Sequence, residues 1–214
     1  MASVPGKLDG AAAPAPPPTA PTPPSSDQRE RRRRVIDAAF ELGAERGYDA
    51  VQMRDVSAIA NVSLATIYRY FSSKDHLLAA AMTEWTAKLQ HRVAQSPPRG
   101  ATAADQLADV LGRACRAMAR QPKLSAALVR ALSSADPGVR QSADQVQRQI
   151  EAMASGILVD LDPAVRSDIM AVLGHVWYST LVAWANDRIT FDDVIGELER
   201  AVRVVVAPYE RARV

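Results

Sequence analysis

Signals that begin and end helices recur along this chain, and they constrain its fold more than any other feature. Capping boxes and proline breaks divide the sequence into segments of helical length. The capping boxes are Ser72/Asp75 and Thr190/Asp193, an N-cap followed by proline is Asp162-Pro163, and the breaks are Pro97-Pro98 and Pro122. Aromatic residues make up only 5% of the chain and β-branched runs are scarce. These features predict an all-α protein without strands.

Between these signals, the spacing of apolar residues predicts about nine helices. The first should bury one face and end at Gly47, acting as a left-handed C-cap. The second should bury Val56 and Ile59, and Ser63 should cap the third. The expected ranges are 28–46, 53–60, 64–70, 74–95, 103–121, 124–132, 139–158, 163–186 and 190–207.

Composition separates a tail from the helical part of the chain. Eight of the 14 prolines lie before residue 27, so we expect residues 1–26 to form a disordered Ala/Pro-rich tail. The remaining expected divisions are a DNA-binding domain over 27–78, a ligand-binding and dimerisation domain over 79–207, and a C-terminal tail over 208–214.

The formal net charge of +2 hides a local concentration of positive charge. Between Arg29 and Arg34 the chain reads RERRRR, with five arginines against one glutamate. These arginines fall in the first turns of a helix, where the macrodipole already presents positive charge. The run is either a solvated helix face or a surface for an anion such as a phosphate backbone.

Two short helices separated by a tight turn follow the first long helix, which is the pattern of a helix-turn-helix. Asn61 suits a turn that needs a positive φ. Ile67 and Phe71 should face inward, which leaves the other side of the second short helix for DNA. Thr66 can contact a thymine methyl or a phosphate, Arg69 can reach a guanine edge, and tyrosine hydroxyls suit phosphates.

The stretch MRDVSAIANVSLATIYRYFSSKDHLL resembles the helix-turn-helix signature of TetR-family repressors, through its Thr-Ile-Tyr-x-x-Phe-x-x-Lys core. The resemblance covers about Arg31–Leu78. Two positions depart from the family pattern: Asn61 replaces the usual glycine, and Gln52 stands where a serine or threonine commonly caps the helix. With the residues argued above, the resemblance gives the expected DNA-binding set: Arg54, Ser63, Ala65, Thr66, Tyr68, Arg69, Tyr70 and Lys74.

Three further stretches, YDAVQMRDV, RAMARQPKLSAALVRA and VWYSTLVAWANDRI, resemble the KstR-type repressors of sterol catabolism in actinobacteria. That resemblance implies a repressor of lipid or steroid catabolism genes, released by a CoA thioester of a sterol side-chain acid. The alternative is a TetR-type repressor that responds to fatty acyl-CoA or to drugs.

The second half of the chain carries more apolar helix than one core requires. We expect a pocket for a small apolar or acyl-CoA effector, lined by Met118, Leu124, Leu128, Met153, Trp177, Leu181 and Trp184, although each could be plain core packing. Arg113, Arg116, Arg120 and Arg130 offer a cationic mouth for a CoA phosphate, or a solvated face. The last two helices are apolar over wide arcs, which predicts a homodimer that reads palindromic operator DNA through two heads.

Other classes of protein are poorly supported. Tyr70-x-x-x-Lys74 has the spacing of short-chain dehydrogenases, but no strand or glycine-rich phosphate loop accompanies it. His76, His91 and His175 lack metal-ligand spacing, and His175 reads as a packed histidine. Cys115 reads as helix packing, and no apolar run approaches a membrane span. We therefore expect a cytoplasmic, non-enzymatic protein without a cofactor, metal or membrane partner, and an α-helical enzyme is the remote alternative.

Overall fold

A computed structural model describes residues 25–211 of the chain, and within them it shows nine α-helices, one short 3₁₀ turn and no strand. The all-α prediction is therefore confirmed. The elements are α1 (Ser26–Arg46), η1 (Tyr48–Ala50), α2 (Met53–Ala60), α3 (Leu64–Tyr70), α4 (Lys74–Gln95), α5 (Ala103–Ala119), α6 (Pro122–Leu132), α7 (Pro137–Ser155), α8 (Pro163–Ala185) and α9 (Phe191–Arg211).

Short-range capping explains why several helices begin where they do. Asp162 accepts a hydrogen bond from the Ala164 amide at 2.8 Å at the start of α8, directly before its first-turn proline. The predicted Thr190/Asp193 box forms in both directions. The predicted Ser72/Asp75 box is wrong, because Ser73 is the N-cap of α4.

Other helix boundaries differ from the expected ones by a few residues. α1 begins at Ser26, and Ser25 forms a capping box with Gln28, so these two serines, expected in the tail, belong to the first helix and its cap. The rest of the predicted tail, residues 1–24, lies outside the described part. Gly47 has φ 84° and ψ −169°, so its φ is positive but it is not a left-handed cap. The chain passes from α1 into η1 through this positive-φ, extended-ψ conformation, which glycine adopts readily because it has no Cβ.

The last helix continues past its predicted end at residue 207, through Pro208, to Arg211. Proline removes one backbone donor but does not stop the final turn, which is held to the rest of the fold. The carboxylate of Glu210 accepts a hydrogen bond from the Ala104 amide at 2.9 Å, at the beginning of α5. The expected tail over 208–214 is therefore helix as far as the structure describes it.

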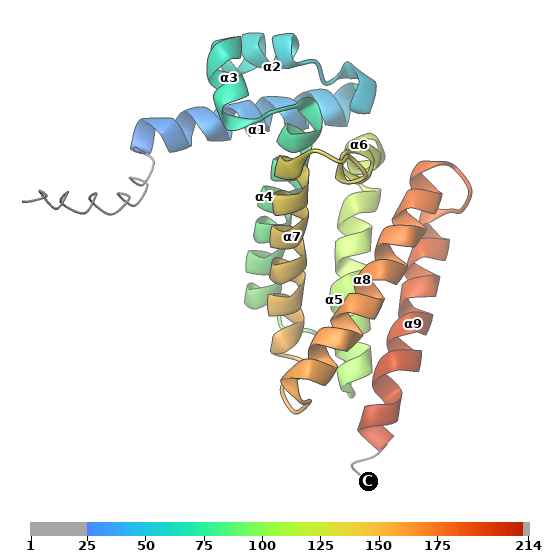
Figure 1. The fold of residues 1–214 in the computed structure, drawn as a ribbon. Coiled ribbons are helices and arrows are strands. Elements are labelled where there is room, and N and C mark those ends of the chain that lie inside the picture. Colours follow the sequence, from blue (N-terminus) through green and yellow to red (C-terminus); the bar gives the residue numbers. More distant parts are fainter. Residues whose placement is uncertain (1–24, 212–214) are drawn as a thin grey trace, which may run out of the picture.

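The helices form two layers, which we call the head (α1–α3) and the body (α4–α9). α1 lies across the top of the body, with α2 and α3 on its far side (Figure 1). The long helices of the body run downward from it, whereas α6 is seen nearly end-on (Figure 1). Within the body, α4 packs chiefly on α7, while α9 packs on α5 and α8. α6 lies directly under α1 and joins the two layers.

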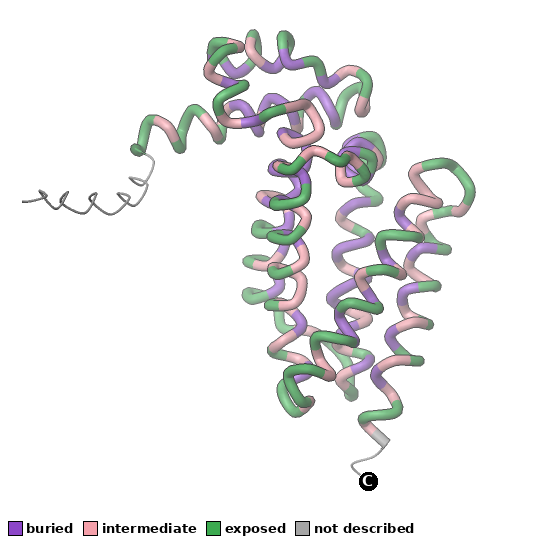
Figure 2. The backbone as a smooth tube through the Cα atoms, viewed as in Figure 1, coloured by how far each residue is buried: buried purple, intermediate pink, exposed green. Residues whose placement is uncertain are grey.

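One core runs through both layers, with exposed residues on the outer helix faces (Figure 2). The seam between α1 and α6 is especially close, because a Cβ added at Gly43 would lie 2.9 Å from Cδ1 of the buried Leu124. Cys115 is fully buried, so its predicted packing role is confirmed. Ile59 is 48% exposed and His175 is also exposed, contrary to expectation, since each lies on the side of its helix that no neighbour covers.

Candidate nucleic-acid interface and effector cavity

The turn between α2 and α3 has the tight geometry that its sequence predicts. Asn61 has φ 49° and ψ 51°, the left-handed conformation that asparagine tolerates better than most residues. The Val62 amide then donates to the Ser57 carbonyl at 3.2 Å, and the Ser57 hydroxyl donates to the Val62 carbonyl at 2.7 Å. These paired bonds fix the direction in which α3 leaves the turn.

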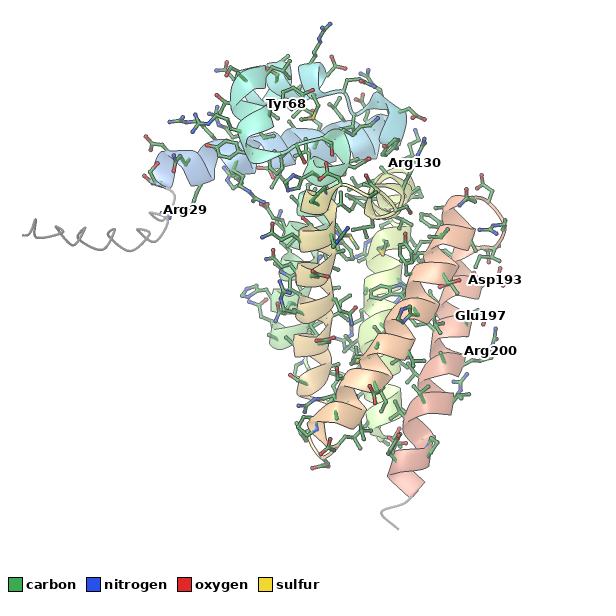
Figure 3. The ribbon with its side chains drawn as sticks, in the orientation of Figure 1. Arg29, Tyr68, Arg130, Asp193, Glu197 and Arg200 are labelled. Atoms are coloured by element: carbon green, nitrogen blue, oxygen red, sulfur yellow. The ribbon has the colours of Figure 1, made fainter. Side chains whose placement is uncertain are left out.

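α3 is anchored by its apolar side and presents its other side to solvent. Ser63 caps it by accepting a hydrogen bond from the Thr66 amide at 3.2 Å, as predicted. Ile67 and Phe71 are buried, so both inward-facing predictions are confirmed. Tyr68 is 51% exposed on α3, which lies on the side of α1 away from the body (Figure 3).

Most of the expected DNA-binding residues lie at the surface of this head. Five are exposed and two are half-buried. The exposed ones are Arg54, Ser63, Ala65, Tyr68 and Arg69, and the half-buried ones are Thr66 and Tyr70. Lys74 lies apart, at the start of α4, where its Nζ is 4.0 Å from the centre of the Tyr48 ring. Its ammonium is thus already held by a partner within the chain.

Sequence reasoning missed the cluster around Tyr48. The ring contacts Lys74 and Arg130, whose guanidinium carbon lies 4.1 Å from the ring centre, and its hydroxyl donates to Asp75 at 2.5 Å. Burial, together with the hydrogen bond to that carboxylate, raises the pKa of Tyr48 to about 12. Tyr48 lies between helices, where periodicity carries no signal, and the partners are far apart in sequence.

The arginine run at the start of α1 is partly used within the chain. Arg32 forms an ion pair with Glu84 of α4 at 2.8 Å. Arg33 contacts Glu30 at 2.7 Å and Asp37 at 3.0 Å. Two of the five arginines are thus neutralised locally, while Arg31 is exposed and has no ion pair among the described residues. Phosphate binding by the remaining arginines stays a prediction.

A hydrogen-bonded junction connects the head to the body below α3. The hydroxyls of Ser72 and Ser73 donate to the Asp136 carboxylate at 2.8 and 2.7 Å. The same carboxylate accepts from the Gly138 amide at 2.8 Å and so caps α7. The Ser73 and Ser72 hydroxyls hold the pKa of Asp136 below its usual range. One side chain therefore joins the N-termini of α4 and α7.

His76 lies beside this junction, in the first turn of α4. Its Nδ1 accepts a hydrogen bond from the Ser72 amide at 3.2 Å, and its ring meets Phe71 edge-on at 5.5 Å between centres. Burial lowers the pKa of His76, although Asp136 acts in the opposite direction. Burial and the Ser72 amide therefore both favour the form of the ring in which Nδ1 accepts a hydrogen bond.

An apolar cavity of about 320 Å³ lies between α7 and α8, with contributions from α4 and α6. Its lining is Met82, Leu132, Ala143, Val146, Gln147, Ile150, Gly174, Trp177, Tyr178 and Leu181. Two of the expected effector residues, Trp177 and Leu181, line it. Met118, Leu124 and Leu128 are instead buried in the core, Met153 packs partly buried against it, and Trp184 packs edge-on against Phe191 at 4.6 Å.

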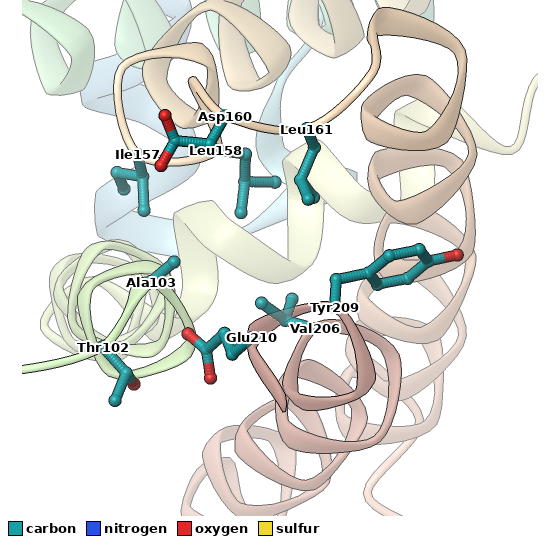
Figure 4. Close-up of a pocket in the computed structure, with 9 residues that line it drawn as sticks. All are labelled: Thr102, Ala103, Ile157, Leu158, Asp160, Leu161, Val206, Tyr209 and Glu210. Carbon is teal, nitrogen blue, oxygen red and sulfur yellow. The ribbon is translucent and has the colours of Figure 1, made fainter. Parts of the chain in front are cut away.

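A second hollow of about 290 Å³ lies between the beginning of α5, the turn after α7 and the end of α9 (Figure 4). These segments lie at the end of the body away from the head (Figure 1). Its walls include Ile157, Leu161 and Tyr209, but two carboxylates, Asp160 and Glu210, also line it. The cavity between α7 and α8 is the more apolar of the two, and it alone touches α4 and α6, which adjoin the head. No group of three or more metal-ligating side chains occurs within residues 25–211. Nor does any helix there combine the length and apolar character of a membrane span.

Comparisons with known proteins match both layers. The family "Bacterial regulatory proteins, tetR family" matches residues 35–81, and "Tetracyclin repressor-like, C-terminal domain" matches residues 100–205. The HTH-type transcriptional repressor KstR of Mycobacterium tuberculosis is 35% identical over 84% of this chain and 82% of its own length. The fatty acid metabolism regulator protein of Bacillus subtilis is 28% identical over 59% of this chain and 66% of its own length.

The fold also matches a solved structure over nearly the whole length of that structure's chain. The crystal structure of a TetR transcriptional regulator from Rhodococcus sp. RHA1 superposes with a TM-score of 0.77 at 27% identity. The match covers 85% of this chain and 98% of that one.

Proposed function

The chain belongs to the tetR family of bacterial regulatory proteins, and from that premise we propose that it is a repressor that binds palindromic operator DNA and is released by an apolar effector. The observation that carries this proposal is the exposed side of α3, held at a fixed angle by the Asn61 turn and the buried Ile67. A helix presented in this way fits the major groove of DNA.

The side chains on α3 suit two kinds of DNA contact. Arg69 is exposed and has no ion pair among the described residues, so its guanidinium is free to bond a guanine edge in two places. Tyr68 and Ser63 carry hydroxyls suited to phosphate oxygens, and Ala65 permits close approach. Arg69 would therefore give the protein its preference for a base sequence, while the hydroxyls would fix the position of α3 on the DNA backbone.

We propose that two copies pair through α8 and α9. α8 is apolar on average and has no single apolar face, yet a single chain covers only part of it. Val172 on α8 is 48% exposed and Val204 on α9 is 73% exposed, in helices that already pack together. Pairing these faces as a four-helix bundle would remove apolar surface from water and place two heads on one palindrome.

The proposed effector site is the cavity between α7 and α8. Its apolar walls suit a rigid or extended hydrocarbon, while Gln147 and Tyr178 offer polar contacts. Together with the KstR-type resemblance, this supports a sterol-derived acyl-CoA as the effector and lipid or steroid catabolism genes as the target. The alternative effector is a fatty acyl-CoA, which the similarity to a fatty acid metabolism regulator favours.

We propose that release works by a shift in population between two positions of the head. α7 lines the cavity and is capped by Asp136, which also holds Ser72 and Ser73 at the start of α4. An effector that moves α7 therefore moves the base of α3 and the spacing of the two reading helices. A coupling on the order of 1–3 kcal/mol is enough for a 5–150-fold change in operator affinity.

A gel-shift titration with the DNA upstream of the gene tests the reading helix. Tyr68→Ala should weaken binding across sequences, and Arg69→Ala should also relax base preference, on the order of 1–3 kcal/mol for a bidentate base contact. Tyr209→Ala, which removes an exposed tyrosine at the base of the body, is the matched control. Unchanged affinity for Tyr68→Ala would contradict the placement of the interface.

Filling the cavity tests the effector site. Ala143→Phe places a ring in the space between α7 and α8, whereas Ala152→Phe places the same ring on the exposed side of α7. In a thermal-shift assay with a steroid-CoA and a fatty acyl-CoA, only Ala143→Phe should lose stabilisation by the effector, with operator binding retained. Equal stabilisation of both variants would remove this cavity from consideration.

A further inference from the structure

The facing sides of α4 and α5 form a channel rich in positive charge, which we call the cationic groove. Two adjoining hollows of about 260 and 350 Å³ make it up, and they share Arg92, Ala117 and Arg120. Between them they are lined by five cations, Lys88, Arg92, Arg113, Arg116 and Arg120, and by one carboxylate, Asp37. Four of the five cations, all except Arg113, are exposed at the rim of these hollows.

Most of this charge has no counter-ion within residues 25–211. Lys88, Arg92, Arg116 and Arg120 form no ion pair within the described residues. Arg113 differs, since it contacts Asp109 and donates to the Ser96 carbonyl at 2.7 Å. Among the described residues that line the groove, the one carboxylate, on Asp37, is itself paired with Arg33 at 3.0 Å.

These cations line two adjoining hollows that share Arg92 and Arg120, so the groove gathers their charges at one place on the surface. Like charges within about 8 Å of one another are poorly screened at physiological salt, so their proximity opposes folding unless an anion joins them. Guanidinium groups bind phosphate oxygens through two parallel hydrogen bonds, which suits Arg92, Arg116 and Arg120 to a phosphoryl group.

The groove does not face the DNA proposed for α3. Its upper end includes Asp37 and Phe40, which lie on α1 against the body, while α2 and α3 cover the opposite side of α1 (Figure 1). The same end holds two half-buried aromatic rings, Phe40 and Trp85. Nζ of Lys88 lies 5.8 Å from the centre of the Phe40 ring. A planar group beside the phosphoryl site would find rings to stack on.

We propose that the cationic groove is a second ligand site, which binds a small anion carrying more than one phosphoryl group. Two ligands could supply these phosphoryl groups. One is a free nucleotide, and the other is the nucleotide head of a CoA thioester whose acyl part fills the apolar cavity. Met82 lines that cavity and Leu89, two turns along α4, lines the groove, so both sites share this helix. This proposal is argued from the residues of the groove and does not depend on the proposed repressor function.

Isothermal titration of the full chain with ATP, free coenzyme A and AMP, in phosphate-free buffer at 150 mM salt, tests this site. ATP or coenzyme A should bind more tightly than AMP, and binding should weaken as salt rises. The double variant Arg92→Ala/Arg120→Ala should lose on the order of tenfold or more in affinity. Arg148→Ala, an exposed arginine of α7 outside the groove, should bind as the unchanged chain does.

A palmitoyl-CoA titration separates the two sources. If ATP binds and Arg92→Ala/Arg120→Ala abolishes it, the groove takes a free nucleotide. If only palmitoyl-CoA binds, and the double variant weakens it while Arg148→Ala does not, the groove holds the head of a composite ligand. Absence of binding by all four probes, or equal binding by both variants, overturns the proposal. So does a double variant that loses only operator DNA, because the groove would then serve nucleic acid.

Discussion

Cys115 is sealed from solvent between α5 and its neighbours, and burial raises the pKa of its thiol to about 12. Because the thiolate is the reactive form, the folded protein should not react with a maleimide at neutral pH. The single cysteine should be labelled completely once the chain is unfolded in guanidinium chloride, as mass spectrometry would report. Rapid labelling of the folded protein would show that α5 opens readily.

His76 should make the folded protein less stable in mild acid. Its pKa is lowered by burial, so below the ordinary value of 6.5 the unfolded chain takes up a proton that the folded chain resists. Stability should therefore fall as pH drops through that value, in melting curves measured between pH 7.5 and 5. His76→Gln, which keeps an acceptor, should flatten the curve.

The control for this pH dependence is His91→Gln, on the exposed side of the same helix. It should leave the slope as it is. The pKa of Asp136 is also lowered, so its carboxylate stabilises the fold at any pH above the ordinary pKa of 3.8. That stabilisation is lost only as the pH falls below 3.8, outside the range of this experiment. A slope unchanged by His76→Gln would assign the acid sensitivity to another group.

At the scale of single residues, local patterns predicted what depends on near neighbours. The left-handed Asn61, the Ser63 cap and the inward Ile67 follow from spacing within a few positions. The partner of Lys74 did not follow, because Tyr48 and Arg130 come to it from an irregular segment and from α6. Such contacts exist only after the head has docked on the body.

Two helices of the body begin with the same aspartate-proline cap, but only one is connected to the head. Asp136 caps α7 and holds Ser72 and Ser73, whereas Asp162 caps α8 alone. Each aspartate-to-alanine change should cost about 1 kcal/mol of stability through the lost cap. Only Asp136→Ala should also reduce the effect of the effector on operator affinity, measured by gel shift with and without effector.

Asp162→Ala is the matched control for this coupling. It should lower the melting temperature while leaving the ratio of operator affinities with and without effector unchanged. If both variants reduced that ratio equally, loss of helix stability rather than the Asp136 junction would explain the effect.

At the scale of elements, the number and order of the helices were predictable, while several ends were not. Prolines and capping residues mark helix starts within the sequence itself, as at Pro163. The last turn of α9 survives Pro208 because Glu210 reaches the start of α5, a contact across 106 positions. Ser73 caps α4 in place of Ser72, and both serine hydroxyls bind Asp136 of the distant α7 cap. Tertiary partners thus decided the ends that local rules missed.

For the whole molecule, we expect a dimer that depends on the outer faces of α8 and α9. Val172→Asp would bury a charge at the centre of the proposed pairing, which is costly without a partner. Sedimentation velocity at micromolar concentration should then show monomers. Val159→Asp, at a valine that is 62% exposed in the turn after α7, should leave the dimer intact. Dimers that persist in Val172→Asp would place the pairing surface elsewhere.

The arrangement of cavities was the least predictable property of the molecule. The sequence marked a surplus of apolar residues, yet Met118, Leu124 and Leu128 fill the core, while Ala143 and Gly174 help leave the space empty. Small residues at the right place create a cavity, and periodicity does not distinguish them from close packing. Arg113, Arg116 and Arg120 gather in the cationic groove, but Arg130 lies against Tyr48.

The seam where α1 meets α6 has a consequence for how such chains diverge. Gly43 and Leu124 fill one contact so closely that any side chain at position 43 displaces the buried leucine. The two positions are therefore not free to vary separately. A relative that carries alanine at position 43 should carry a residue smaller than leucine at position 124. The two positions should therefore vary together among related sequences.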